Sequence, residues 1–173
     1  MVDSLVKRRP SGSGLFLLVL LAALLAFPLW RTRDVDHPLA SREHFDVCGL
    51  LPPLPAELEG MQRRSGPDRC DVVDSAGATV LGIGLVSQRS SGAGSAHLRE
   101  AYATWLKEVR ASGAVDIREE AGPWRSASSY RSGAHHEVLV EDGGLMIVLL
   151  SDRLESSALV AYAATLARAL RSA

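Results

Sequence analysis

The chain has 173 residues, 47% of them apolar and 23% charged, so it is too apolar to be disordered throughout and long enough for one domain plus a terminal segment. Its formal net charge of −1 excludes a strongly basic nucleic-acid-binding protein, and we expect no nucleic-acid partner. Aromatic residues make up only 5%, so Leu, Val, Ile and Ala must supply most of the core.

The charge is distributed unevenly along the chain. Residues 1–33 carry a net charge of +4, whereas residues 34–173 carry −5. Leu15–Trp30 is a run of sixteen residues without a polar side chain, between two basic clusters. With the small residues in front of it, the run provides the roughly 20 residues needed to cross a ~30 Å hydrocarbon core. We therefore predict a transmembrane helix over residues 13–32, which makes the membrane itself a partner.

Four interpretations of this segment compete. A cleaved signal peptide needs small residues after the apolar run, but Phe27–Trp30 is bulky and His37–Ala40 is a weak late candidate. A lipoprotein needs a Cys directly after the run, and the first one is Cys48. A soluble buried helix is disfavoured because the run has no polar face. The pattern favours an uncleaved signal anchor.

The basic residues also predict the orientation of this anchor. Three of them precede the span and two follow it closely, which favours a cytoplasmic N-terminus and a C-terminal domain outside the cell. The predicted organisation is a single-pass protein of the cell membrane. Its parts are a cytoplasmic basic tail over 1–12, the anchor over 13–32, a juxtamembrane linker over 33–45 and an extracytoplasmic domain over 46–173.

Cys48 and Cys70 are the only cysteines in the chain. Outside the cytoplasm, a single pair predicts a disulfide. A metal site of both cysteines with His44 is a sharper hypothesis, but it lacks the usual ligand spacing. A reactive thiol, or a pair of reduced and buried thiols, would also account for two cysteines. We predict the disulfide, with no metal and no cofactor.

Hydrophobic periodicity beyond Cys48 predicts an α+β domain. A helical turn between Pro55 and Gly60 is followed by a loop over 63–69. Strands are expected over 70–74, 78–88, 114–120, 124–130, 134–141 and 145–150. A helix over 96–112 ends at Gly113, and a second one is opened by an Asp152-x-x-Glu155 capping box and reaches Leu170. Because the later strands are joined by tight turns, we expect an antiparallel sheet with both amphipathic helices packed on one face.

Two features of the predicted strands point to close packing. Gly82-Ile83-Gly84 resembles part of a nucleotide-binding loop, but the third glycine is missing and no helix starts there. The two glycines share a strand face, so we expect them to let a helix approach the sheet closely. Leu145–Leu150 is apolar on both faces, which indicates a central strand covered on both sides, or an interface.

Few residues suggest chemistry. His135 and His136 are neighbours on a strand and point to opposite faces, so they do not share a metal ion easily. Ser95, His97 and Glu100 are the best candidates for a catalytic site without a recognisable motif. No nucleophile elbow, phosphate-binding loop or zinc motif occurs. We therefore predict no catalytic residues and lean against an enzyme.

Several short features resemble the small actinobacterial membrane-anchored or lipoprotein-type extracytoplasmic domains of unknown function. These are the N-terminal anchor, the Cys48-x-Leu-Leu-Pro opening, Cys70 before a hairpin and the Ala/Leu-rich segment Ala158–Leu170. The preference for Arg over Lys and the absence of Asn are typical of a high-GC genome. The chain departs from that pattern in having Asp71 after Cys70 and no lipoprotein cysteine. The resemblance implies an antiparallel sheet on helices, similar to PsbP-like folds, and supplies no catalytic residues.

Together these features predict a membrane-anchored extracytoplasmic binding or accessory domain without catalytic activity. Its partner would be a protein or a component of the cell envelope. The alternative is a cell-envelope hydrolase, which would need a concave pocket with converging polar groups. An uncovered apolar face at Leu145–Leu150 would favour the binding domain instead.

Overall fold

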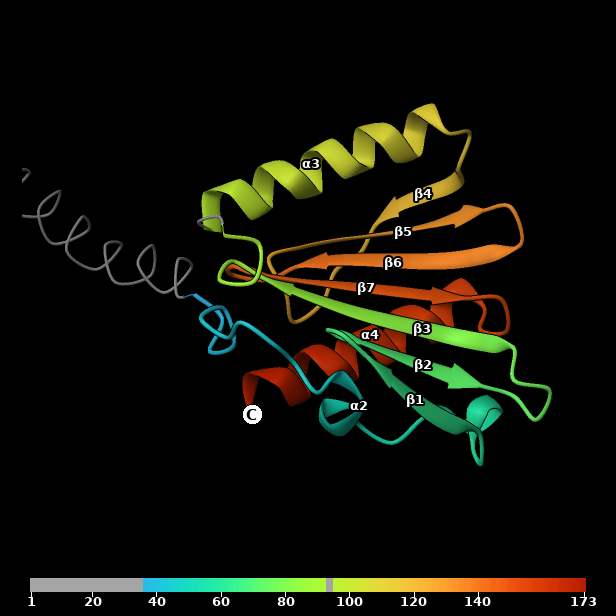
Figure 1. The fold of residues 1–173 in the computed structure, drawn as a ribbon. Helices are drawn as coiled ribbons and strands as arrows, with labels where there is room; N and C mark the ends of the chain where they lie inside the picture. Colours follow the sequence, from blue (N-terminus) through green and yellow to red (C-terminus); the bar gives the residue numbers. More distant parts are fainter. Residues whose placement is uncertain (1–35, 93–94) are drawn as a thin grey trace, which may run out of the picture. The chain divides into compact units, whose positions relative to one another are not determined.

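The computed structural model describes residues 36–92 and 95–173, and Asp36–Ala173 forms one compact unit (Figure 1). A seven-stranded antiparallel sheet has the order β1-β2-β3-β7-β6-β5-β4. The strands are β1 (Gln62–Gly66), β2 (Arg69–Val73), β3 (Thr79–Ser87), β4 (Val115–Glu119), β5 (Ser126–Ser132), β6 (His135–Glu141) and β7 (Leu145–Ser151). The helices are α2 (Val47–Leu50), the 3-10 turn η2 (Ala56–Leu58), α3 (Ser95–Ala111) and α4 (Ser156–Arg171). The α+β class and the antiparallel sheet are confirmed.

The main core lies between the sheet and α4. Strand β7 is at the centre of the sheet, and its Leu145, Ile147 and Leu149 are buried on this side. The apolar stripe of α4 packs against them; its buried members are Leu159, Tyr162, Ala163, Leu166, Ala167 and Leu170. Each fully buried Leu or Ile contributes about 1.5–3 kcal/mol, so this interface supplies most of the driving force for folding.

Helix α3 packs on the opposite face of the sheet (Figure 1). Among the described residues, its buried apolar cluster consists of Leu98, Leu139 and Met146. Side chains alternate across a strand, so Leu139 and Met146 point away from the core that contains Val138 and Ile147. The expectation that both helices share one face is wrong. Periodicity identifies the apolar stripe of each helix but not the side of the sheet on which it packs.

Residues 36–45, which the sequence predicts as part of a linker, pack as part of the domain. Leu39, Ala40 and Phe45 are buried. The His37 N–H donates to the carbonyl of Gly143 at 2.6 Å, in the turn between β6 and β7. A Cβ atom at Gly144 would lie 3.2 Å from the Cβ of Ala40, so the turn needs glycine both for its positive φ and for this close contact.

The ends of two elements differ from the prediction. The predicted loop over 63–69 is wrong in its first half, because Gln62–Gly66 forms the edge strand β1. The predicted capping box is absent: α4 begins at Ser156, and the side chain of its N-cap residue Glu155 makes no capping bond. All six predicted strands and both predicted long helices are present.

Within residues 36–92 and 95–173, no helix has the length and apolar character needed to cross a membrane. The predicted cytoplasmic tail over 1–12 and the predicted anchor over 13–32 lie outside the described residues.

Candidate functional site

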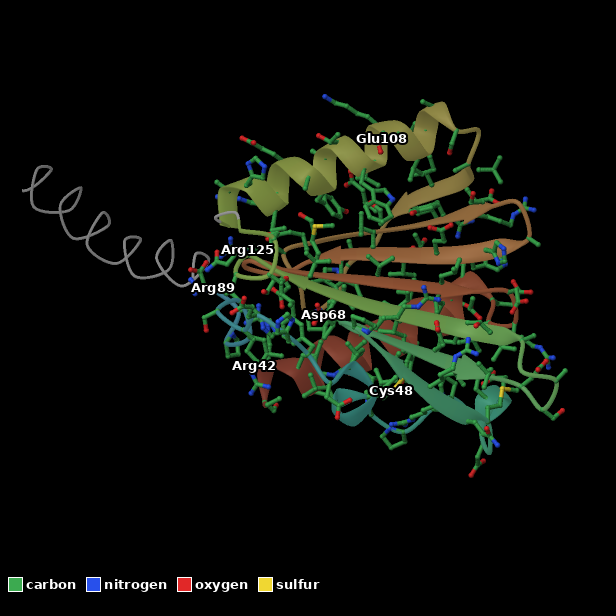
Figure 2. All side chains as sticks on the ribbon, viewed as in Figure 1. Arg42, Cys48, Asp68, Arg89, Glu108 and Arg125 are labelled. Atoms are coloured by element: carbon green, nitrogen blue, oxygen red, sulfur yellow. A yellow bond between two sulfur atoms is a disulfide. The ribbon has the colours of Figure 1, made fainter. Side chains whose placement is uncertain are left out.

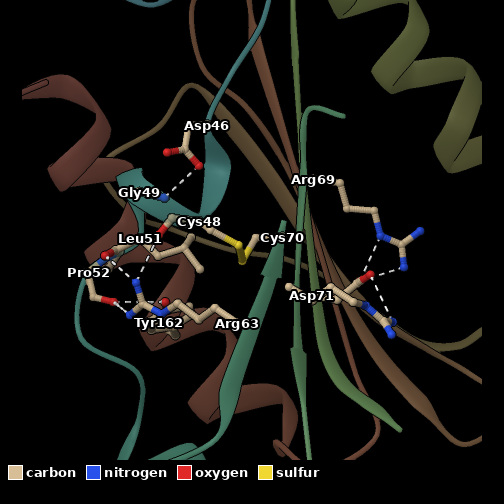
Figure 3. Close-up of a disulfide and its surroundings, with 11 residues drawn as sticks. Asp46, Cys48, Gly49, Leu51, Pro52, Arg63, Arg69, Cys70, Asp71 and Tyr162 are labelled. Atoms are coloured by element: carbon tan, nitrogen blue, oxygen red, sulfur yellow. Dashed lines mark hydrogen bonds and ion pairs between the residues drawn. A yellow bond between two sulfur atoms is a disulfide. The ribbon is translucent and has the colours of Figure 1, made fainter. Parts of the chain in front are cut away.

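The predicted disulfide between Cys48 and Cys70 is confirmed (Figure 3). It joins α2 to the buried strand β2 with a Cα–Cα distance of 5.0 Å. Both sulfurs are therefore used, and the hypothesis of a metal site with His44 is wrong. The His44 imidazole instead lies 3.8 Å from the carboxylate of Asp68.

Arg63 fixes the segment that follows this disulfide. Its guanidinium donates hydrogen bonds to the carbonyls of Cys48 at 3.1 Å, Leu51 at 3.4 Å and Pro52 at 3.0 Å (Figure 3). The Tyr162 hydroxyl also donates to the Pro52 carbonyl at 3.4 Å, and burial raises the pKa of this phenol to about 12. These contacts satisfy backbone carbonyls where prolines exclude regular structure, so they stabilise the fold rather than form a site.

The face of the sheet that carries α3 is only partly covered (Figure 1). Helix α3 lies over β6 and β7, and no described helix packs over β1, β2 and β3 on this side. We call this part the uncovered sheet face. Its residues, which share one side of the four strands β1, β2, β3 and β7, are Arg64, Arg69, Asp71, Gly82, Gly84, Val86, Val148 and Leu150.

Two glycines form the middle of the uncovered sheet face. Gly82 lies between Asp71 and Leu150, and Gly84 lies between Arg69 and Val148. A Cβ atom at Gly84 would meet no described atom within 4 Å, and one at Gly82 would meet only the Asp71 Oδ1 at 3.6 Å. The expectation that these glycines admit a helix is therefore wrong for the described residues. No described atom fills the space above Gly84, whereas Gly82 is buried between Asp71 and Leu150.

A charged cluster borders the glycines. The Nε and Nη2 atoms of Arg69 donate to Asp71 Oδ1 at 2.8 and 2.7 Å (Figure 3). Arg64 Nη2 lies 3.7 Å from Asp71 Oδ2 and donates to Thr79 Oγ1 at 3.4 Å. Both arginine side chains are exposed, whereas that of Asp71 is only 12% exposed. One shielded carboxylate thus orients two exposed guanidinium groups.

A polar seam under α3 borders the other side of the uncovered sheet face. The indole N–H of Trp105 donates to the Tyr130 hydroxyl at 3.1 Å, which donates to Glu137 Oε2 at 2.8 Å. Burial and this carboxylate raise the pKa of Tyr130. The hydroxyls of Tyr102 and Ser128 are 2.9 Å apart. Glu137 is the register partner of Leu150, so the seam begins where the uncovered sheet face ends.

The structure separates the remaining predicted site residues. His97 and Glu100 are exposed on α3 with 3.8 Å between Nδ1 and Oε2, while the side chain of Ser95 is not described. His135 is exposed, and His136 Nε2 lies 3.8 Å from Glu155 Oε2. Figure 2 shows all described side chains on the fold. Among them, no group of three His, Cys, Asp or Glu residues is placed to hold a metal ion.

Comparisons of the chain with protein-family models, with curated proteins and with solved structures find no match. The resemblance to actinobacterial extracytoplasmic domains therefore stays a prediction from short motifs.

Sequence reasoning noticed the two glycines but missed Arg64, Arg69 and Asp71. Arg69 meets Asp71 because they lie two residues apart on one face of β2, and Arg64 meets Asp71 because β1 pairs with β2 in the register Arg64 with Asp71. Strand β1 is polar and exposed along most of its length, so it carries no apolar alternation that reveals it. The Gly-x-Gly pattern inside an otherwise apolar strand was the one usable signal.

Proposed function

We propose that this protein is a single-pass, membrane-anchored extracytoplasmic binding domain without catalytic activity, and that the uncovered sheet face is its binding surface. The observation that carries the proposal is the space above Gly84, which no described atom fills. Glycine inside a strand costs about 0.5–1 kcal/mol relative to alanine. No described neighbour requires that cost at Gly84. A partner that approaches the backbone closely would explain it.

The apolar residues beside the glycines support the same conclusion. Val86 is 37% exposed, and Val148 and Leu150 of the central strand are only partly buried. An uncovered apolar area next to charged residues on a sheet is typical of a surface that binds a partner. The disulfide and the predicted anchor support placement outside the cytoplasm.

Thiol labelling tests the placement. A membrane-impermeant maleimide is applied to intact cells producing the full chain, before and after reduction. We expect labelling of Cys48 and Cys70 only after reduction. Labelling that needs cell lysis but no reductant would put the domain in the cytoplasm and overturn the proposal.

Site-specific photo-crosslinking tests the surface. Benzoylphenylalanine replaces Gly84 in one full-length variant and Arg168 in another, in cells that naturally carry the protein. Arg168 is exposed on α4, which covers the opposite face of the sheet. We expect one discrete adduct from position 84, identified by mass spectrometry, and none from position 168. Equal crosslinking patterns from positions 84 and 168 would argue against the uncovered sheet face as the binding surface.

A further inference from the structure

The charged cluster on the uncovered sheet face has an excess of positive charge. Arg64 and Arg69 share the single carboxylate of Asp71, which leaves a net charge of +1 there. Residues 34–173 as a whole carry −5, so this surface differs in sign from the rest of the domain. A ligand attracted to the cluster would thus be anionic.

The two guanidinium groups retain most of their hydrogen-bonding capacity. Each has five N–H donors in a planar fork. Arg69 uses two of its donors on Asp71, and Arg64 uses one on Thr79; the other donors meet no described acceptor. The Asp71 carboxylate already holds the Arg69 side chain in place. Binding would therefore cost less side-chain entropy than it does for a free arginine. A planar carboxylate is the group that such a fork binds in bidentate fashion.

The sheet surface at Gly84, which we call the floor, lies next to the charged cluster and can accept an apolar side chain. Gly84 is opposite Arg69 on one neighbouring strand and Val148 on the other, and nothing described fills the space of its missing side chain. Val86, two residues along the same face of β3, is exposed. A side chain of Leu or Val size placed over Gly84 would contact apolar neighbours and leave the arginines free to bind a carboxylate.

On the premise that the uncovered sheet face is the binding surface, we propose that its occupant is an acidic peptide segment of a partner protein, with carboxylates on Arg64 and Arg69 and an apolar side chain over Gly84. Every second side chain of an extended peptide faces the same side, so a segment with an apolar residue at position i and acidic residues at i+2 and i+4 matches this arrangement. An anionic glycan matches it less well, because the residues of this face include no aromatic ring on which a sugar would stack. Inorganic phosphate would use the arginines but not the floor.

Fluorescence anisotropy of a labelled peptide tests this chemistry on the full-length protein in detergent micelles. The probe is fluorescein-labelled Gly-Leu-Ser-Glu-Ser-Glu-Gly, in which Leu and both Glu residues share one side of the extended chain, and its matched control has Gln in place of both Glu residues. We expect the Glu peptide to bind at least tenfold more tightly than the Gln peptide. The double variant Arg64→Gln/Arg69→Gln should remove that difference, whereas Arg168→Gln should change the affinity by less than twofold.

A second variant separates the floor from the charges. Gly84→Val should fold, because its Cβ atom would meet no described atom within 4 Å, and it should weaken peptide binding at least fivefold. Oligogalacturonate and inorganic phosphate are added as competitors. Equal binding of the Glu and Gln peptides, or full displacement by either competitor at lower concentration than the unlabelled peptide, would overturn the acidic peptide. If the acidic peptide fails this test but position 84 still gives a discrete photo-crosslink, the uncovered sheet face remains the proposed binding surface. Failure of the acidic peptide is thereby distinguished from failure of the binding surface.

Discussion

Arg171 binds both carboxylate oxygens of Asp142, and the side chain of Asp142 is completely buried. The Nε to Oδ2 distance is 2.9 Å. Asp142 precedes the glycine turn between β6 and β7, and Arg171 is in the last turn of α4. This ion pair therefore joins the end of the C-terminal helix to the turn that also holds residues 36–40.

Removing Arg171 should destabilise the domain strongly. Arg171→Met leaves the Asp142 carboxylate buried without its counter-ion, which costs about 3 kcal/mol or more in the free energy of unfolding. Urea unfolding of the full chain, followed by tryptophan fluorescence, measures this loss. Asp142→Asn in the Arg171→Met background should recover part of it, because the buried charge is gone. A double variant no more stable than the single one would contradict the explanation.

Stability should fall in mild acid because of His37. This side chain is buried, its Nδ1 accepts from the Leu39 N–H at 3.1 Å, and its Nε2 has no partner among the described residues. Desolvation lowers the pKa of His37 below its usual 6.5; the Asp142 carboxylate opposes this shift and Arg171 adds to it. As the pH falls, His37 is therefore protonated in the unfolded state before it is protonated in the folded state. The contribution of His37 is complete above pH 6.5 and decreases as the pH falls below it.

His37→Asn isolates this effect, since the amide oxygen of Asn can accept from the Leu39 N–H without titrating. Burial raises the pKa of Glu141 above its usual 4.5, and this shift acts in the opposite direction because it favours the folded state as the pH falls. The unfolding free energies of the wild type and of His37→Asn are measured from pH 7.5 to 5.5. Because both proteins contain Glu141, its effect cancels in the difference between them. A difference that does not change with pH would argue against titration of His37.

Loss of the disulfide should cost about 3 kcal/mol in the loop-entropy model, because Cys48 and Cys70 are 22 residues apart. Cys48→Ala/Cys70→Ala removes it without placing a polar atom at the buried position 70. The wild type and the double variant are compared by thermal unfolding with and without reductant. We expect the reductant to lower the melting temperature of the wild type only. A wild type insensitive to reductant, under conditions that labelling shows to open the bond, would contradict this prediction.

Gly84→Val should increase stability by roughly 0.5–1 kcal/mol, because it removes glycine entropy from the unfolded state and fits a strand. Gly77→Val is the matched control, since Gly77 has a φ of 81° that disfavours any β-branched residue. In urea unfolding, the free energy of unfolding should therefore increase for Gly84→Val and decrease for Gly77→Val. A destabilised Gly84→Val would indicate that something covers this position.

The apolar elements could be predicted because their periodicity is a local property. Periodicity predicts six of the strands and both long helices, whereas the disulfide is predicted from the single pair of cysteines. Strand β1 was missed because it is a polar edge strand, stabilised by its register with β2 rather than by its own pattern. The sides on which α3 and α4 pack were missed because an amphipathic helix fits either face of a sheet.

The candidate site was harder to predict than the fold, because it depends on residues from four strands. The glycines of β3 were visible, but their role depends on what lies above them. The pairing of Arg64 with Asp71 depends on register, which a polar strand does not specify from its sequence.

The small apolar cluster under α3 has a consequence for local stability. Among the described residues, a cluster of three buried apolar side chains, the buried Val109 and the Trp105–Tyr130 and Tyr102–Ser128 hydrogen bonds help to hold this helix, whereas α4 packs on an extensive core. We expect amide protons of α3 to exchange through local opening that leaves the sheet and α4 intact, well before global unfolding. In that opened state Tyr130 and Glu137 would join the exposed surface. A partner that contacts them would select a minor conformer of the protein and slow its closing.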